Sequence, residues 1–405
     1  MQYGRTLAGF LGRHASRGKA RLVVGARQTG KSTLFRMLRS PDDLLIDLQE
    51  RSERIRLAQD PEALVRSLLP PARRPRRVFI DEIQRVPELL DEIQGILDRH
   101  PGRFTFTLTG SSARRLRGRG VNLLPGRIHR FRLSPVCLWE QAAPGAGSVL
   151  PAPGRSVGPP FPLRRLEETL VLGNLPGAFV EGEGFKKTLE SYAEVYIEEE
   201  VMREAAARNL GDYGRFLALA AVESGKPINL TKISQESGVA LTTIRGFYAV
   251  LEDTLLGFTL PPFSRSGRVR VLKTPKFYFF DVGVRNALAR LPLERGILAT
   301  EGRPLLEHWV ACELAARIGY VGRTRRLSYW RTVDGAEVDF VLELPREAIP
   351  IEVKYTERPR PEDARGAERF LDRYPGLARR GLVVCRCTRP EKLTRRVRAV
   401  PWQSL

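Results

Sequence analysis

The sequence of 405 residues has only four cysteines and four histidines, and it contains no long apolar run. No stretch approaches the roughly 20 apolar residues of a membrane span, and the first residues lack the apolar core of a secretory signal. The cysteines are too scattered for a disulfide framework or for a zinc site at the usual ligand spacing. We therefore expect a soluble, cytoplasmic protein with no membrane partner.

Lysine is scarce as well, although the chain is strongly basic. Of the 67 Lys and Arg residues only 10 are Lys, and the formal net charge is +21. Most of the excess positive charge falls in residues 1–140. Because contacts with phosphates release counterions, such a balance favours polyanions as partners. We expect DNA, with RNA as the alternative; a bias toward Arg can also follow genome base content.

The length and the apolar content of 42% indicate two or three domains. Residues 141–160, QAAPGAGSVLPAPGRSVGPP, are dominated by Pro, Gly, Ala and Ser. That composition predicts a linker or a loop. The expected division is therefore a first domain over 1–140, a middle domain over 161–295 and a last domain over 296–405.

The first domain contains a phosphate-binding pattern. RLVVGARQTGKSTLFRML runs from an apolar strand through a glycine-bounded loop into an amphipathic helix and fits GxxxxGK[ST]. Lys31 would reach the terminal phosphates of ATP, and Ser32 would bind Mg²⁺. The expected nucleotide-binding residues of this phosphate loop are Gly25, Ala26, Arg27, Gln28, Thr29, Gly30, Lys31, Ser32 and Thr33.

A second acidic motif follows about 50 residues after this loop. RRVFIDEIQ is an apolar strand that ends in Asp81 and Glu82. Asp81 would hold the magnesium through water or Ser32, and Glu82 would orient the attacking water as the general base.

Two further strand candidates, LLIDL and FTFTLTGSS, complete a pattern that resembles the AAA-type branch of phosphate-loop ATPases. The resemblance implies a sensor residue at the end of the last strand, either Thr109 or Ser111. It also implies an arginine finger that reaches a neighbouring subunit and hence a homo-oligomer. Arg127 is the first choice in the span ARRLRGRGVNLLPGRI, whose arginines can equally form a solvated basic loop or contact DNA phosphates.

The middle domain is predicted to be helical and to contain a helix-turn-helix. In NLTKISQESGVALTTIRGFYAVLED, a helix ends at Ser237-Gly238 and a second helix begins near Leu241. Thr242, Thr243 and Arg245 on its first turns are the candidate nucleic-acid contacts. PPFSRSGRVRVLKTPKFYFFD supplies two strands, as the wing of a winged helix would. Such modules bind DNA or proteins, and the sequence leaves both open.

The last domain contains GAEVDFVLELPREAIPIEVKYTE, two apolar strands around a turn. Asp339, Glu352 and Lys354 could meet there, and two carboxylates with one ammonium suit metal-dependent phosphodiester cleavage. A charged surface hairpin is the alternative. The spacing resembles restriction-endonuclease-like nucleases, which implies a further acidic ligand from a preceding helix. Glu307 in GRPLLEHWVACEL is the candidate, and Glu313 is a poorer one.

The complete order of motifs, GARQTGKST, FIDEIQ, LTGSS, LEDTLLGF, FYFFDVGVRNAL, LLEHWVACEL, GAEVDFVLE and IEVKYTE, resembles a bacterial and archaeal family of uncharacterised ATPases. The resemblance implies an α/β fold with three parts: an AAA-type phosphate-loop ATPase domain, an all-α and winged-helix middle, and an α/β restriction-endonuclease-like end. It suggests an ATP-driven DNA-processing enzyme with ATP and Mg²⁺ as cofactors. The alternative is a nucleotide-switch ATPase whose last domain only binds nucleic acid or a partner protein.

Overall fold

The computed structural model describes residues 3–13, 18–68, 76–110, 127–142, 148–150, 154, 156–196, 210–265, 274–321 and 325–405. The chain divides into two compact units. The first unit comprises Met1–Pro135, Gly154–Pro160 and Asp253–Leu256, and the second comprises Val136–Pro153, Phe161–Glu252 and Gly257–Leu405. Among the described residues, no helix is both long and apolar enough to span a membrane.

This division differs from the boundaries that composition suggests. The ranges 161–295 and 296–405 fall almost wholly within one unit, and the Pro- and Gly-rich range 141–160 is shared between both units. Its final part does not behave as a free linker, because the backbone N–H of Gly4 donates to the carbonyl of Pro159 at 2.6 Å. Arg5 also forms an isolated bridge with Val157.

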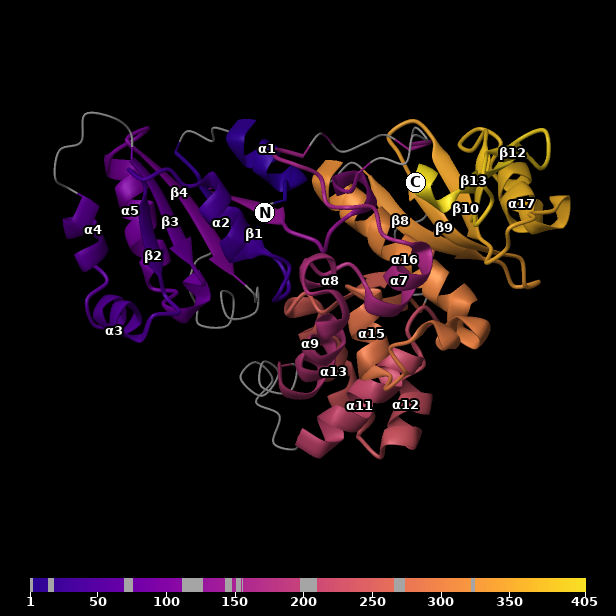
Figure 1. Ribbon diagram of the computed structural model, residues 1–405, viewed down its shortest axis with the longest axis horizontal. Helices are drawn as coiled ribbons and strands as arrows, with labels where there is room; N and C mark the ends of the chain where they lie inside the picture. Colours follow the sequence, from indigo (N-terminus) through magenta and orange to yellow (C-terminus); the bar gives the residue numbers. More distant parts are fainter. Residues whose placement is uncertain are drawn as a thin grey trace. The chain divides into compact units, whose positions relative to one another are not determined.

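The first unit is an α/β layer structure (Figure 1). Its strands β2, β3, β4, β1 and β5 lie in that order in one sheet, and each adjacent pair is parallel. The elements in chain order are α1 (Thr6–Arg13), β1 (Ala20–Val24), α2 (Lys31–Leu38), β2 (Leu44–Asp47), α3 (Arg51–Gln59), α4 (Ala63–Leu68), β3 (Arg76–Asp81), η1 (Ile83–Arg85), α5 (Leu89–Arg99), β4 (Phe104–Gly110) and β5 (Ile128–Arg132).

Both faces of this sheet are covered, because successive strand side chains point to opposite sides. On one face Val78 and Ile80 pack in the same core as the leucines of α3, α4 and α5. On the other face Phe79 contacts Phe35 of α2, with ring centroids 5.2 Å apart. The strand order matters for the site, because β4 lies between the strand before the phosphate loop and the strand that ends in Asp81.

The second unit begins with a helical region. Its elements are η2 (Leu138–Glu140), α7 (Leu166–Leu172), α8 (Gly177–Val180), η3 (Gly182–Gly184), α9 (Phe185–Ser191), η4 (Tyr192–Tyr196), α11 (Leu210–Val222), α12 (Leu230–Ser237), α13 (Leu241–Asp253), β6 (Gly257–Leu260), β7 (Lys276–Phe279), α15 (Val282–Leu288) and η5 (Arg295–Ile297). Strands β6 and β7 form an antiparallel pair.

A six-stranded mixed sheet of order β12-β13-β11-β10-β9-β8 forms the rest of this unit. Strands β8, β9 and β10 are antiparallel neighbours, whereas β10, β11 and β13 run parallel. The elements are α16 (Leu298–Val321), β8 (Arg326–Arg331), β9 (Glu337–Glu343), β10 (Ala348–Val353), η6 (Pro361–Ala364), α17 (Arg365–Arg373), β11 (Gly381–Cys385), β12 (Glu391–Lys392), β13 (Val397–Pro401) and η7 (Trp402–Ser404).

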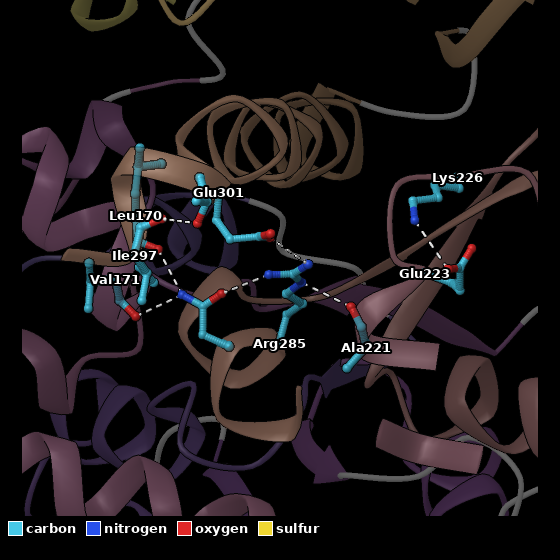
Figure 2. Close-up of polar contacts among 10 residues, drawn as sticks. Leu170, Val171, Ala221, Glu223, Lys226, Arg285, Ile297 and Glu301 are labelled. Carbon is cyan, nitrogen blue, oxygen red and sulfur yellow. Dashed lines mark hydrogen bonds and ion pairs between the residues drawn. The ribbon is translucent and has the colours of Figure 1, made fainter. Parts of the chain in front are cut away.

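Side chains of helix α15 form hydrogen bonds both with the helical region and with α16 (Figure 2). These contacts explain why residues 161–295 and 296–405 fall almost wholly within one unit. The buried guanidinium of Arg285 donates to the carbonyl of Ala221 at 2.9 Å and to Glu301 of α16 at 3.2 Å. Its neighbour Asn286 donates to the carbonyls of Leu170 and Val171. Buried polar groups need partners, and these come from both sides of the expected boundary at residue 295.

Helices α12 and α13 lie where the sequence predicts a helix-turn-helix. Gly238, at φ 71°, ends α12 in the left-handed conformation that glycine adopts without strain. Asn229 caps the start of α12 by accepting from the backbone N–H of Lys232. Of the two strands expected for a wing, the second is present as β7. It pairs with β6 and is buried along its whole length. Residues 266–273, which precede it, lie outside the described part of the chain.

Candidate functional site

The phosphate loop follows β1 and opens α2, as the sequence predicts. Two of its residues have positive φ, Gln28 at 59° and Gly30 at 92°. At Gly25 a Cβ would lie 2.6 Å from the carbonyl oxygen of Leu133, so only glycine fits there without displacement. The ammonium of Lys31 is buried inside this loop and donates to the carbonyls of Gly25 and Ala26 at 2.9 and 3.1 Å.

Arg5 stabilises the phosphate loop through hydrogen bonds to backbone carbonyls, and it was not among the predicted site residues. Its buried guanidinium donates to the carbonyl of Thr29 at 2.9 Å and to the carbonyl of Ser134 at 2.6 Å. The same side chain therefore ties the phosphate loop to the chain after β5. No local pattern around Arg5 could have revealed this, since its partners lie 24 and 129 residues away.

The acidic end of β3 meets the phosphate loop. Ser32 Oγ donates to Oδ2 of Asp81 at 2.7 Å, and Gln49 Nε2 lies 3.5 Å from the same oxygen. These groups come from α2, β3 and the turn after β2, which the parallel sheet aligns at one edge. The expected pair of magnesium-binding residues is thus brought together.

One buried hydroxyl fixes both acidic residues. Thr109 is fully buried at the end of β4, and its Oγ1 donates to Oδ1 of Asp81. The same Oγ1 accepts from the backbone N–H of Glu82 at 2.9 Å. A threonine hydroxyl can donate once and still accept, so Thr109 satisfies both groups at once. Of the two sensor candidates, Thr109 occupies this position; Ser111 lies outside the described residues.

Glu82 itself adopts a backbone conformation that is costly for a residue with a side chain. Its φ and ψ are 60° and 49°, in the left-handed region, which costs about 1–3 kcal/mol. The hydrogen bond from its N–H to Thr109 holds that conformation. Its carboxylate accepts from the side-chain amide of Gln84. The strain places the Glu82 side chain at the sheet edge beside Asp81 instead of on a continued strand.

Arg127, the candidate arginine finger, lies away from the phosphate loop of its own unit. It directly precedes Ile128, which pairs with Ala20 at the start of β1, whereas the phosphate loop follows the other end of that strand. Its guanidinium forms an ion pair with Asp98 at 2.6 Å. Arg127 therefore does not contact the nucleotide site of its own unit, because parallel pairing places it at the opposite sheet edge. Its role as a finger toward another subunit stays a prediction.

The second unit brings together the three residues that the sequence predicts for cleavage, Asp339, Glu352 and Lys354. Ile351 pairs with Phe340 across β10 and β9, and this antiparallel register places Glu352 opposite Asp339. Both carboxyl groups are buried, Glu352 at 5% and Asp339 at 8% exposure. Asp339 accepts from the backbone N–H of Val353 at 2.8 Å. Lys354 Nζ lies 3.3 Å from Glu352.

Two further cationic and phenolic groups enter this site from β7. Lys276 Nζ lies 3.3 Å from Glu307 and 3.0 Å from Glu337, and Tyr278 donates to Glu307 at 2.8 Å. We name Glu307, Glu337, Asp339 and Glu352, with Lys276 and Lys354, the carboxylate cluster. Lys276, Tyr278 and Glu337 were not among the predicted site residues. The alternation in KFYF was the available signal, since it puts Lys276 and Tyr278 on one side of the strand.

The charges of this cluster are strongly coupled. Burial raises the pKa of Asp339 well above its usual value, and the nearby Glu307 and Glu352 raise it further. Burial also raises the pKa of Glu352, which Lys354 opposes only in part. For Lys276, burial acts to lower the pKa, but Glu307, Glu337 and Asp339 outweigh it and leave the pKa raised. Lys276 is therefore a permanent internal cation of the cluster.

The start of α17 packs directly on these carboxylates. A Cβ at Gly366 would lie 2.1 Å from Oε1 of Glu352 and 2.2 Å from the carbonyl oxygen of Glu337. Only glycine permits this approach. Glu313, the poorer sequence candidate on α16, lies elsewhere: its carboxylate accepts from the backbone N–H of Leu138 at 3.0 and 3.1 Å.

The two sites differ in how well they suit a divalent cation. In the nucleotide site a hydroxyl and a carboxylate, the oxygen ligands that Mg²⁺ prefers, stand beside a phosphate loop. In the carboxylate cluster the Lys276 ammonium already bridges Glu307 and Glu337. Across the described ranges, no group of three or more His, Cys, Asp or Glu residues is arranged to hold a metal ion. The predicted metal ligands Glu307, Asp339 and Glu352 thus lie together without forming a metal centre as arranged.

The parallel five-stranded sheet and the glycine-bounded loop are consistent with an AAA-type phosphate-loop domain. Residues 17–142 match the family described as AAA domain, residues 163–295 match a domain of unknown function (DUF8612), and residues 303–405 match another (DUF4143). Together these matches show that the chain is similar to uncharacterised proteins that contain an AAA domain.

Curated relatives carry no assigned activity. The uncharacterized protein Mb2031c of Mycobacterium bovis is 27% identical over 362 residues, which span 88% of this chain and 74% of that protein. The uncharacterized protein Rv2008c of Mycobacterium tuberculosis matches with the same figures. The crystal structure of protein VC1899 from Vibrio cholerae is 12% identical and covers 90% of this chain and 88% of that one. Its TM-score is 0.16, so it carries no argument about the fold.

Proposed function

We propose that this chain binds ATP with Mg²⁺ and hydrolyses it at the nucleotide site of the first unit. The observation that carries the proposal is the Thr109 hydroxyl, which binds Asp81 and the backbone N–H of Glu82 at once. A purely structural carboxylate pair at a strand end would not need a strained Glu82 beside a phosphate loop. The match of residues 17–142 to the AAA domain supports the same conclusion.

Each group has a chemical task. The backbone of the phosphate loop and the ammonium of Lys31 would bind the phosphates, while Ser32 Oγ and Asp81 would hold the magnesium. When bound, the magnesium would neutralise negative charge that develops on the phosphates. Glu82 would accept a proton at a carboxylate oxygen from the attacking water, and Gln84 orients that carboxylate. Thr109 keeps both acids in register.

Steady-state hydrolysis of ATP by the full chain tests this proposal. We expect wild type to release phosphate only when magnesium is present, and Lys31→Ala to lose both binding of a fluorescent ATP analogue and hydrolysis. Lys19→Ala, a change of the same kind just before β1, is the control and should behave as wild type. Hydrolysis by Lys31→Ala at the wild-type rate would overturn the site assignment.

A second candidate function follows from the carboxylate cluster. Its buried carboxylates and the lysines that meet them support binding and processing of phosphodiesters. Metal-dependent cleavage of DNA at Asp339, Glu352 and Lys354 stays a prediction. Of the expected metal ligands, Glu307 forms an ion pair with Lys276. DNA contact through Thr242, Thr243 and Arg245 also stays a prediction; the three side chains are exposed, as that role requires. Assembly into a homo-oligomer is likewise untested.

The cleavage prediction has a direct assay. Wild type and Lys354→Ala are incubated with single-stranded, duplex and branched DNA, with magnesium or manganese and with or without ATP. Cleavage by wild type that Lys354→Ala lacks would support a nuclease. Intact DNA in every reaction, with ATP hydrolysis retained, would leave the first proposal standing and favour a binding role for the second unit.

A further inference from the structure

A pocket of about 660 Å³ lies beside the carboxylate cluster, between the start of α16 and the chain that follows β10. Its charged lining residues are Arg303, Lys354, Arg358, Arg360 and Asp363, and Thr300, Tyr355 and Thr356 add hydroxyl groups. We call this pocket the basic groove. All of its lining residues belong to the second unit.

The positive charge of the basic groove is not neutralised by acidic residues that line it. Asp363 is its one acidic lining residue, and Oδ2 of that carboxylate accepts from the backbone N–H of Arg360 at 2.8 Å. Lys354 forms an ion pair with Glu352. No described carboxylate forms an ion pair with Arg303, Arg358 or Arg360, although ion pairs are frequent elsewhere in this unit. The groove therefore presents three guanidinium groups that are available to an anion.

The backbone that carries these arginines is held in place. A Cβ at Gly302 would lie 2.5 Å from the ring of Tyr355, so the first turns of α16 pack closely on that ring. Arg386 lies over the same ring at 4.5 Å. The hydroxyl of Thr356 accepts from the backbone N–H of Arg358 at 3.2 Å. A prearranged set of donors loses less conformational entropy when it binds a ligand.

We propose that the basic groove binds the phosphodiester backbone of a nucleic acid and leads it to Lys354. Arg binds phosphate oxygens in a bidentate manner, and several arginines along one groove can follow the successive phosphates of a strand. Lys354 lies in the groove and also contacts Glu352, which joins the groove to the carboxylate cluster. An anionic membrane surface suits this groove less well, because none of the exposed large apolar side chains of the described residues lines it.

This proposal deepens the second candidate function and does not depend on ATP hydrolysis. It also changes the expected location of the nucleic-acid contacts, from α13 to the groove beside the cluster. Phosphate contacts position a nucleic acid without reading its sequence, so the groove would accept DNA and RNA of any sequence.

The experiment measures fluorescence anisotropy of labelled single-stranded DNA, duplex DNA and RNA with the full chain, between about 50 and 200 mM salt. The test variant carries Arg358→Glu and Arg360→Glu. The matched control carries Arg389→Glu and Arg395→Glu, which change the net charge equally at exposed positions outside the groove. We expect at least tenfold weaker binding for the test variant, and a slope of log K against log salt that is smaller by about 2.

Several outcomes would overturn the proposal. These are an equal loss in the control, unchanged binding by the test variant, no binding of any nucleic acid by wild type, and a groove-dependent binding of anionic vesicles alone. If the charge reversal unfolds the chain, Arg358→Gln with Arg360→Gln removes the same charges at similar size. ATP hydrolysis is measured on every variant, so that failure of the groove and failure of the nucleotide site are told apart.

Discussion

The nucleotide site and the carboxylate cluster are built in opposite ways. The nucleotide site takes most of its groups from one continuous loop, Gly25 to Thr33, and completes it with the ends of two parallel strands. The carboxylate cluster takes one residue each from β7, α16 and β10, two from β9, and Lys354 from the chain just after β10. A site built from one loop, which we call contiguous, can be recognised in a short stretch of sequence. A site whose residues come from several elements, which we call assembled, forms only when the core of the unit is folded. The first should therefore respond to mutation in activity, and the second in stability.

The largest expected effect is on catalysis at the contiguous site. Glu82→Gln removes the proton acceptor but keeps the shape of the side chain and its contact with Gln84. We expect hydrolysis to fall by about 10²- to 10⁴-fold, with ATP affinity and thermal stability close to wild type. Glu50→Gln, at an exposed position of the same unit, is the control. A Glu82→Gln protein that hydrolyses ATP normally would show that another group is the base.

At the assembled site the largest effect should be on folding. Lys276→Met leaves the buried Asp339 and its neighbours Glu307 and Glu337 without their shared cation, which should cost about 3 kcal/mol of unfolding free energy. The control is Lys226→Met, which removes an exposed ion pair with Glu223 (Figure 2) and should cost under about 1 kcal/mol. Denaturant unfolding measures both. Equal losses for the two variants would mean that Lys276 does not hold the cluster.

The same contrast explains what the sequence could and could not predict. The phosphate loop, Asp81 and Glu82 are recognisable because their chemistry requires fixed spacings along the chain. Asp339 and Glu352 are predictable because two adjacent strands place them opposite each other. Arg5 is not, since it finds its partners through contacts that only the folded core creates. For Lys276, the alternation in KFYF gives the side of the strand but not the carboxylates that it meets.

The two compact units do not coincide with the domain ranges expected from the sequence. Composition marks residues 141–160 as a linker, yet Gly4 pairs with Pro159. The expected division separates 161–295 from 296–405, yet the polar groups of α15 are satisfied by both ranges. Composition reports how much of a segment can be buried, and it does not report which neighbour supplies a partner.

A smaller effect is expected from a buried carboxyl group away from both sites. Burial, and to a lesser degree Glu140, raises the pKa of Glu313 from 4.5 to about 8, against the N–H of Leu138 and the charge of Arg317. The folded chain then holds a proton that the unfolded chain releases above pH 4.5, so stability falls as pH rises toward 8. In Glu313→Gln this decline should be weaker by about 1 kcal/mol or more.

Thermal unfolding across this pH range checks the prediction. The exposed Glu362→Gln is the control and should follow the wild-type curve. Parallel curves for wild type and Glu313→Gln would show that Glu313 does not titrate in this range in the folded chain.

The most direct test of the nucleotide site compares two threonines of one strand. Thr107 and Thr109 are both buried in β4, but Thr109 is the one whose hydroxyl binds Asp81 and Glu82. We predict that Thr109→Val lowers magnesium-dependent ATP hydrolysis by about tenfold or more, since it leaves the Glu82 N–H and one Asp81 oxygen without this hydroxyl, and that Thr107→Val keeps the wild-type rate. Equal rates for the two variants, or no hydrolysis by wild type, would contradict this account.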